Sequence, residues 1–114
     1  MKLYQYPHLI VKNSPVSGYG VFATEDLVTG TLLAACHHVP IPTEDLKDIL
    51  RDYRFISNKE RTHFSIVFGY GSLFNSSETP NAAWEFPTSL QDPFIFITTQ
   101  DIKKGEEIFL NYHN

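Results

Sequence analysis

The chain has one cysteine, no long apolar run and no excess of basic residues. Because Cys36 stands alone, no disulfide can form within the chain and no thiolate zinc site can be built. A lone cysteine also favours a reducing compartment. No stretch has the length or hydrophobicity of a signal peptide or a membrane-spanning helix. We therefore expect one cytoplasmic domain covering residues 1–114, without a membrane association.

The shortage of positive charge narrows the choice of partners. Nine Lys and Arg residues stand against 13 Asp and Glu residues, so the formal net charge is -4. A protein that binds nucleic acid needs a basic face to neutralise phosphates, so no direct nucleic-acid binding is expected. A negative chain suits a positively charged partner such as a lysine-rich peptide. The five histidines show no metal-binding spacing, and His37 and His38 would point to opposite sides of a strand.

Apolar residues make up 42% of the sequence and aromatic residues 14%, mostly in short segments between Gly, Pro, Asn and Ser. This pattern predicts a mainly β fold. The expected strands cover residues 9–12, 21–23, 31–36, 63–68, 82–86 and 94–98, and the last two form a hairpin.

We predict one helix, between Thr43 and Tyr53. The Thr43 hydroxyl would cap it, the acids that follow would favour its N-terminus, and Leu46, Ile49 and Leu50 would share a face with Tyr53.

Two segments, residues 24–30 and 99–105, share the pattern Thr-x-Asp-(Leu/Ile)-x-x-Gly. In each, Asp can bond the backbone of a turn, the aliphatic side chain can enter the core and Gly allows a positive φ. A pseudo-symmetric all-β architecture and two unrelated common turns both fit this repeat.

Three motifs occur in order along the chain. Residues 17–23 read Ser-Gly-Tyr-Gly-Val-Phe-Ala. Residues 74–82 read Phe-Asn-Ser-Ser-Glu-Thr-Pro-Asn-Ala, and residues 101–112 read Asp-Ile-Lys-Lys-Gly-Glu-Glu-Ile-Phe-Leu-Asn-Tyr. Together they resemble the glycine motif, the Asn-His-Ser-x-x-Pro-Asn signature and the closing Gly-Glu-Glu segment of a SET domain. The likeness is to the small stand-alone lysine methyltransferases of bacteria and large viruses, which lack cysteine-rich flanking modules.

The resemblance implies a β-clip-like SET domain of short curved strands, with one short helix and a threaded C-terminal segment. It implies an S-adenosylmethionine-dependent protein-lysine N-methyltransferase, whose cofactor and substrate lysine enter from opposite faces. Its cofactor-binding residues would be Gly18, Tyr19, Gly20, Asn75, Ser76 and Tyr112.

Tyr112 is the expected catalytic phenol, with Tyr53 as a second candidate at the lysine channel. Core packing explains Tyr53 equally well. Asn81 is expected to bond backbone, and the carboxylates of Asp101, Glu106 and Glu107 to lie in a turn and on a solvated or cofactor-distal face.

Two departures from the family pattern keep an alternative open. Position 76 is Ser where the family usually has His, and the chain ends two residues after Tyr112. We expect a second copy to supply the missing channel wall, giving a homodimer that uses residues 108–110 and the hairpin between Trp84 and Phe96.

The alternative is a SET-like binding module with weak or no catalysis. A third class, a β-clip binder of sugar or phosphate, would explain the Asp-Ile-x-x-Gly turn but neither the Asn75 motif nor Tyr112.

Overall fold

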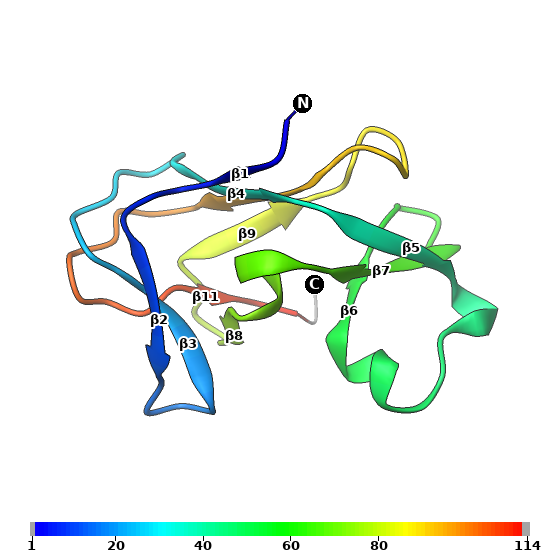
Figure 1. The fold of residues 1–114 in the computed structure, drawn as a ribbon, viewed down its shortest axis with the longest axis horizontal. Helices are drawn as coiled ribbons and strands as arrows, with labels where there is room; N and C mark the ends of the chain where they lie inside the picture. The colour runs from blue at the N-terminus through cyan, green and yellow to red at the C-terminus, as the bar shows by residue number, and fades with distance from the viewer. Residues whose placement is uncertain (1, 113–114) are drawn as a thin grey trace.

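The computed structural model describes residues 2–112, and it is mainly β, as the sequence predicts (Figure 1). The strands are β1 (Tyr4–Gln5), β2 (Leu9–Asn13), β3 (Tyr19–Ala23), β4 (Leu32–Cys36), β5 (His38–Pro42), β6 (Arg54–Ile56), β7 (His63–Val67), β8 (Asn75–Ser76), β9 (Ala82–Glu85), β10 (Phe94–Thr98) and β11 (Phe109–Leu110). Three 3-10 helices, η1 (Thr43–Asp45), η2 (Asp48–Tyr53) and η3 (Gly69–Ser72), complete the described chain.

The core lies on a four-stranded antiparallel sheet with the order β1-β4-β10-β9. Along β10 the side chains of Phe94, Phe96 and Thr98 are buried, while the two isoleucines between them are half-buried. This alternation is what a strand with one face on a core requires. The predicted hairpin is confirmed, because β9 pairs with β10 from Ala82 to Glu85.

The repeated turn segments face each other across a local pseudo-two-fold axis. The backbones of Leu27 and Ile102 exchange hydrogen bonds of 2.7 and 2.9 Å, and both side chains are buried. The two aspartates follow the same symmetry, because each accepts a hydrogen bond from a backbone N–H of the opposite turn. Asp101 Oδ1 accepts from the backbone N–H of Thr29 at 2.9 Å, and Asp26 Oδ1 accepts from that of Lys104 at 2.8 Å. The repeat is therefore a paired structural unit, not two unrelated turns.

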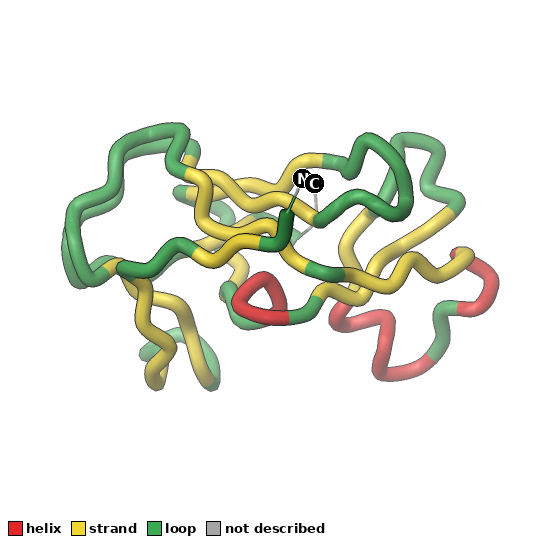
Figure 2. The backbone as a smooth tube through the Cα atoms, turned by 45° about the horizontal axis from the view of Figure 1, so that its top comes forward, coloured by secondary structure: helices red, strands yellow, loops and turns green. Residues whose placement is uncertain are grey.

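One end of the molecule consists of the separate sheet β5-β7-β6 and the helices η1 and η2 (Figure 2). The prediction of one helix from Thr43 to Tyr53 is wrong, because two 3-10 helices replace it. The Thr43 hydroxyl donates to the Arg61 carbonyl at 2.7 Å and caps nothing. Leu46 is extended and buried, and Asp48 has a φ of 57°, so the chain breaks between the two helices.

The C-terminal segment is enclosed by residues 75–81. Strand β11 pairs with β8 in parallel, and the Ser77 N–H donates to the Leu110 carbonyl at 2.8 Å. The Asn81 side chain donates to the Glu107 carbonyl at 2.9 Å and accepts from the Phe109 N–H at 2.7 Å. Asn81 therefore bonds backbone as expected. Ile108 and Leu110 are fully buried, so they cannot form the dimer surface predicted for residues 108–110.

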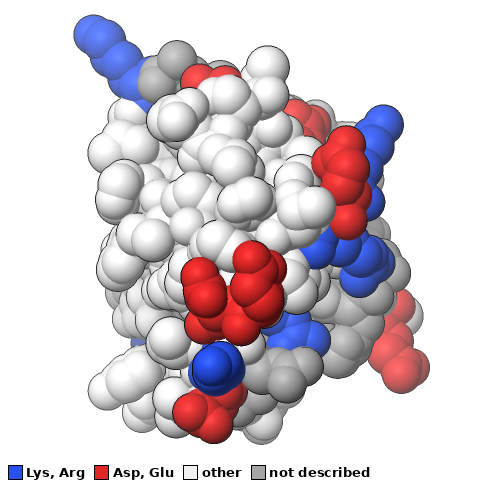
Figure 3. Space-filling view, turned by 90° about the vertical axis from the view of Figure 1, so that its right-hand side faces the viewer, with Lys and Arg blue, Asp and Glu red and all other residues white. Residues whose placement is uncertain are grey.

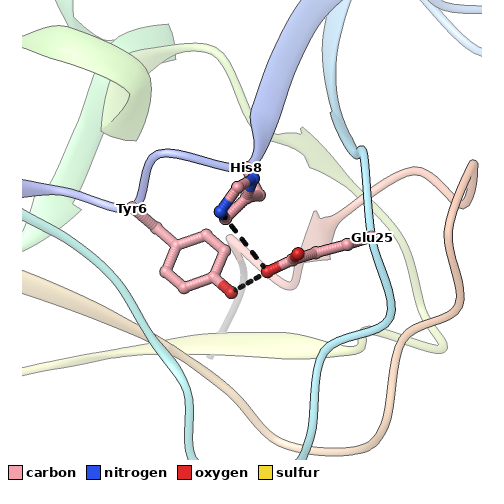
Figure 4. A network of polar contacts seen from close by, with 3 residues as sticks. All are labelled: Tyr6, His8 and Glu25. Carbon is pink, nitrogen blue, oxygen red and sulfur yellow. Dashed lines mark hydrogen bonds and ion pairs between the residues drawn. The ribbon is translucent and has the colours of Figure 1, made fainter.

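The N-terminal segment is fastened by a small polar network (Figure 4). The Tyr6 hydroxyl donates to Glu25 Oε1 at 2.5 Å, and His8 Nε2 lies 3.8 Å from the same oxygen. The hydrogen bond to Glu25 raises the pKa of the Tyr6 phenol. The contact ties the strand entry at His8 to the first turn segment. Among residues 2–112, none of the helices has the length and hydrophobicity to cross a membrane.

Candidate functional site

A cavity of about 530 Å³ opens between the β2–β3 turn, the η2–β6 segment and the C-terminal segment at Tyr112. It brings together five of the predicted site residues: Gly18, Tyr19, Tyr53, Asn75 and Tyr112. The remaining lining residues are Ser17, Leu50, Arg54, Phe55, Ile66, Val67, Ser72, Leu73 and Phe74. The predicted residues Gly20 and Ser76 are not among those that line it.

The turn that carries Gly18 is a tight loop between β2 and β3. The Ser14 N–H donates to the Gly18 carbonyl at 2.8 Å, and Gly18 has a φ of 47°. That left-handed conformation favours glycine. Apart from its chain neighbours, no heavy atom lies within 4 Å of where a Gly18 Cβ would stand. The preference for glycine at this position therefore comes from the backbone conformation and not from a lack of space.

Gly20 has a different reason to be glycine. It is buried within β3, and a Cβ there would lie 2.3 Å from Oε2 of Glu107. Gly20 therefore makes room for a carboxylate behind the cavity wall. We predicted that it contacts the cofactor, and the structure places it away from the cavity lining.

The Asn75 side chain links three parts of the site. Its Nδ2 donates to the carbonyls of Ser17 and Tyr19, at 3.1 and 3.2 Å, and to Glu107 Oε2 at 2.7 Å. The amide therefore ties the glycine turn to the C-terminal segment. Asn75 lies at the cavity, as predicted, but this amide nitrogen is engaged within the protein.

Glu107 is buried, which no sequence motif indicated. Of the two predicted placements, the solvated face fits Glu106, which is exposed, whereas Glu107 is only 9% exposed and does not line the cavity, which is compatible with the cofactor-distal placement. Its Oε1 accepts from the Ser14 hydroxyl at 2.7 Å, and its Oε2 accepts from Asn75. The one sequence signal was its position directly before the apolar residues 108–110.

Tyr112 lines the cavity and is half-buried. Its hydroxyl donates to the Phe74 carbonyl, and its ring meets the Phe55 ring edge to face, with the centroids 5.0 Å apart. Burial raises the pKa of the Tyr112 phenol far above its ordinary value. The side chain is therefore a neutral phenol whose proton is held by a carbonyl, so its oxygen lone pairs are the groups left to act on a ligand.

The Ser76 side chain contacts the backbone of Tyr112. The Tyr112 N–H donates to the Ser76 hydroxyl at 3.3 Å, so this side chain faces the C-terminal segment. Tyr53 stands at the mouth of the cavity and is 56% exposed. Its exposure excludes the core-packing reading that the sequence left open.

An aromatic wall separates this cavity from a second one. Phe55 contacts Trp84 edge to face, with the centroids 5.3 Å apart. Trp84 and Phe86 line a shallower apolar pocket of about 400 Å³ together with Pro80, Ala82, Ala83, Thr99 and Asn111. No sequence motif indicates a role for Phe55, because nothing in the chain order places it beside Tyr112.

Charge at the main cavity is sparse. Among the described residues that line it, Arg54 is the one that carries a charge, and its guanidinium lies 5.3 Å from the Phe64 ring centroid. Among the side chains that the structure describes, no three His, Cys, Asp or Glu are grouped so that they could hold a metal ion. The lining is thus mostly aromatic and aliphatic, with polar groups concentrated at the glycine turn and Asn75.

The sequence model of the SET domain matches residues 18–113. The crystal structure of a proposed histone methyltransferase from Plasmodium falciparum is similar, with a TM-score of 0.79 and 26% identity over 94% of each chain. A humanized mutant of the Chaetomium thermophilum Polycomb Repressive Complex 2, bound to the inhibitor GSK126, shares the fold. Its TM-score is 0.71 and its identity 22%, over 91% of this chain and 14% of that one. No curated protein matches the sequence.

Proposed function

Since the chain belongs to the SET domain family of methyltransferases, we propose that it transfers a methyl group from S-adenosylmethionine to a lysine side chain of a protein or peptide. The observation that carries the proposal is the convergence of three separate motifs. Gly18, Asn75 and Tyr112 come from three distant parts of the sequence and line one cavity.

The cavity suits the cofactor in size and chemistry. Its volume of about 530 Å³ falls in the range of roughly 300–1,000 Å³ that small-molecule sites occupy. Gly18 allows a ligand to approach the backbone, and the apolar wall of Leu73, Phe74 and Val67 suits an adenosine. When bound, the cofactor would supply an electrophilic methyl group on a sulfonium.

A lysine must reach the site uncharged, although its ordinary pKa is about 10.4. The aromatic wall formed by Phe55 and Trp84 disfavours an ammonium by desolvation. We propose that the substrate side chain approaches from the Trp84 pocket while the cofactor occupies the Gly18 cavity. The two would then meet at Tyr112, where alignment supplies most of the rate enhancement.

In this proposal Tyr112 orients the acceptor nitrogen and does not act as a base. Its proton is engaged by Phe74 and its pKa is raised, so the oxygen accepts hydrogen bonds from an amine. Tyr53 lines the Gly18 cavity and not the Trp84 pocket, so in this proposal it would flank the cofactor. Ser76 would act indirectly, by holding the backbone of Tyr112.

The charge of the molecule supports a basic substrate. The end of the molecule that carries β5, β6 and β7 shows an uncharged area above a group of acidic side chains, and basic side chains lie below and to the right of that group (Figure 3). The acids Glu44, Asp45 and Asp48 belong to η1 and η2, which lie at this end. Because both signs of charge occur on this face, it is the formal net charge of -4 that favours a lysine-rich segment.

The test is methyl transfer to a panel of lysine-containing peptides, followed by mass spectrometry. Tyr112→Phe should leave cofactor affinity within about twofold and lower kcat roughly a hundredfold, since a positioned hydroxyl is lost. Tyr4→Phe is the matched control, because Tyr4 is exposed on β1 away from the cavity lining. Equal turnover in the Tyr112→Phe protein would contradict the assignment.

The alternative, a SET-like binding module, rests on Ser76 standing where the family usually has His. The same experiment separates the two. Cofactor or peptide binding without any methyl transfer by the wild-type protein would favour the binding module.

A further inference from the structure

We infer that Glu107 is a positioning residue that sets the shape of the cofactor end of the cavity through Asn75 and the glycine turn. This inference rests on the proposed function. Glu107 does not line the cavity, and its carboxylate lies behind the wall formed by residues 17–19. Any effect on a bound molecule must therefore pass through those residues.

Both carboxylate oxygens of Glu107 are used as acceptors. Oε1 accepts from the Ser14 hydroxyl at 2.7 Å, and Oε2 accepts from Asn75 Nδ2 at 2.7 Å. Ser14 begins the turn between β2 and β3, whereas Asn75 begins β8. One buried side chain thus joins the hairpin turn to the segment that encloses the C-terminus. Hydrogen bonds to a charged acceptor are the stronger kind, and breaking them in a buried place is costly.

Asn75 connects the Glu107 carboxylate to the cavity wall through hydrogen bonds. The nitrogen that donates to Glu107 also donates to the carbonyls of Ser17 and Tyr19, which flank Gly18. With both carbonyls bound to Asn75, Gly18 is held between them in its left-handed conformation at the cavity wall. The orientation of the Asn75 amide is fixed because its nitrogen must face a carboxylate, which only accepts.

The geometry also explains Gly20. A side chain at position 20 would occupy the place of Glu107 Oε2, at 2.3 Å from the Cβ position. The φ of Gly20 is not positive, so its backbone alone would tolerate alanine. The absence of a side chain at position 20 therefore serves the carboxylate, and the two residues act as a pair.

Glu107→Gln is the decisive variant. An amide of the same size keeps one oxygen to accept from Asn75 and turns its NH2 group to the Ser14 hydroxyl, which can accept, so both contacts lose the charge that strengthens them. S-adenosylhomocysteine should bind about tenfold more weakly by isothermal titration, as the loss of charge assistance in these two hydrogen bonds predicts. The KM for S-adenosylmethionine should rise by a similar factor, while kcat at saturating cofactor stays within about twofold.

Glu106→Gln is the matched control. It removes the same charge one residue earlier, from an exposed side chain that accepts from the Lys103 N–H. Its cofactor affinity should equal that of the wild-type protein.

Gly20→Ala is the second variant, since it displaces the carboxylate without changing any charge. It should weaken S-adenosylhomocysteine binding in the same direction as Glu107→Gln, and it decides the question if the Glu107→Gln protein fails to fold. In the unliganded protein, amide hydrogen exchange should be faster in residues 14–19 of either variant than in the wild type.

The outcomes are separable. If the wild-type protein binds no S-adenosylhomocysteine, the proposed function fails. If the wild type binds it and both folded variants bind it equally well, the inference about Glu107 is overturned. A fall in kcat with unchanged affinity would overturn it too, because that result would place Glu107 in the chemistry of the transfer.

Discussion

Tyr112 shows how one residue can be placed by contacts of two kinds. A hydrogen bond to the Phe74 carbonyl sets the direction of the hydroxyl, and the edge-to-face contact with Phe55 sets the plane of the ring. The backbone bond to Ser76 fixes where the side chain starts. An orienting role requires such fixation, because small displacements of a reacting group cost rate steeply.

The pH dependence of turnover follows from the state of Tyr112. Burial raises the pKa of its phenol, so the neutral form persists through mildly alkaline pH. The group that titrates should be the substrate lysine, whose neutral fraction increases with pH. We predict that kcat/KM rises with pH between about 7 and 9.5 in wild type and in Tyr112→Phe alike.

Pre-steady-state and steady-state pH profiles of the two proteins check this prediction. Parallel profiles, offset by a constant factor, are expected. An alkaline limb that is present in the wild type and missing in Tyr112→Phe would mean that the phenol itself titrates.

At the residue scale, the environment of a side chain can be predicted from sequence when its determinants are neighbours along the chain. Gly18 was predictable because a turn glycine with positive φ leaves a local pattern. The burial of Glu107 was not, because its partners Ser14 and Asn75 are far away in sequence and meet it only in the fold. Phe55 was missed for the same reason, since its place beside Tyr112 depends on the packing of β6.

At the scale of elements, the paired turns organise the domain. Each aspartate bonds the opposite turn, and each turn ends in a glycine with a φ near 90°, which is 86° at Gly30 and 90° at Gly105. The turns join β3 to β4 and β10 to the C-terminal segment. They therefore fix the relation between the hairpin that carries Gly18 and the chain end that carries Tyr112.

Asp101 makes this pairing sensitive to pH. The backbone N–H and the hydroxyl of Thr29 lower the pKa of the Asp101 carboxyl below its ordinary value. A depressed carboxyl pKa stabilises the fold above the unfolded-state value of about 3.9, and that contribution is lost as pH falls through the lower folded-state value. Asp101→Asn should therefore lower the melting temperature at pH 7 and have a shrinking effect at more acid pH.

Thermal unfolding across a pH series measures this effect. Glu44→Gln is a matched change of charge at an exposed residue in η1, and it should leave the melting temperature nearly constant. A deficit in Asp101→Asn that stays the same down to the acid end of the series would exclude the titration of this carboxyl as the cause.

The elements were predictable where local pattern decides them and not where long-range contacts do. The alternation of residues 94–98 correctly indicated a strand, because one face of β10 is buried. The helix between Thr43 and Tyr53 failed because the Thr43 hydroxyl bonds to Arg61 and Leu46 packs into the core. Strand β5 contains two prolines and was not predicted, although an edge strand tolerates them.

At the scale of the whole molecule, the cavity mouth carries exposed apolar side chains. Tyr19 is 64% exposed, Tyr53 56% and Leu50 45%, and all three line the cavity. Exposed clusters of this kind commonly mark interfaces. We propose that a second copy covers the mouth to give a homodimer with two-fold symmetry, the commonest arrangement of small oligomers.

Light scattering over a dilution series tests the dimer. The wild type should change from dimer to monomer on dilution, with methyl transfer falling in parallel, and Leu50→Glu should be monomeric at higher concentration. Val28→Glu is the control, since Val28 is 71% exposed but does not line the cavity. A wild-type protein that is monomeric throughout, with activity independent of dilution, would contradict the proposal.

A crystal structure of the protein with S-adenosylhomocysteine and a lysine peptide would locate both ligands at once. We predict that the cofactor product lies between the Gly18 turn and Asn75, and that the lysine enters from the Trp84 side with its amine beside the Tyr112 hydroxyl. Electron density for the cofactor product in another pocket, or a lysine far from Tyr112, would contradict it.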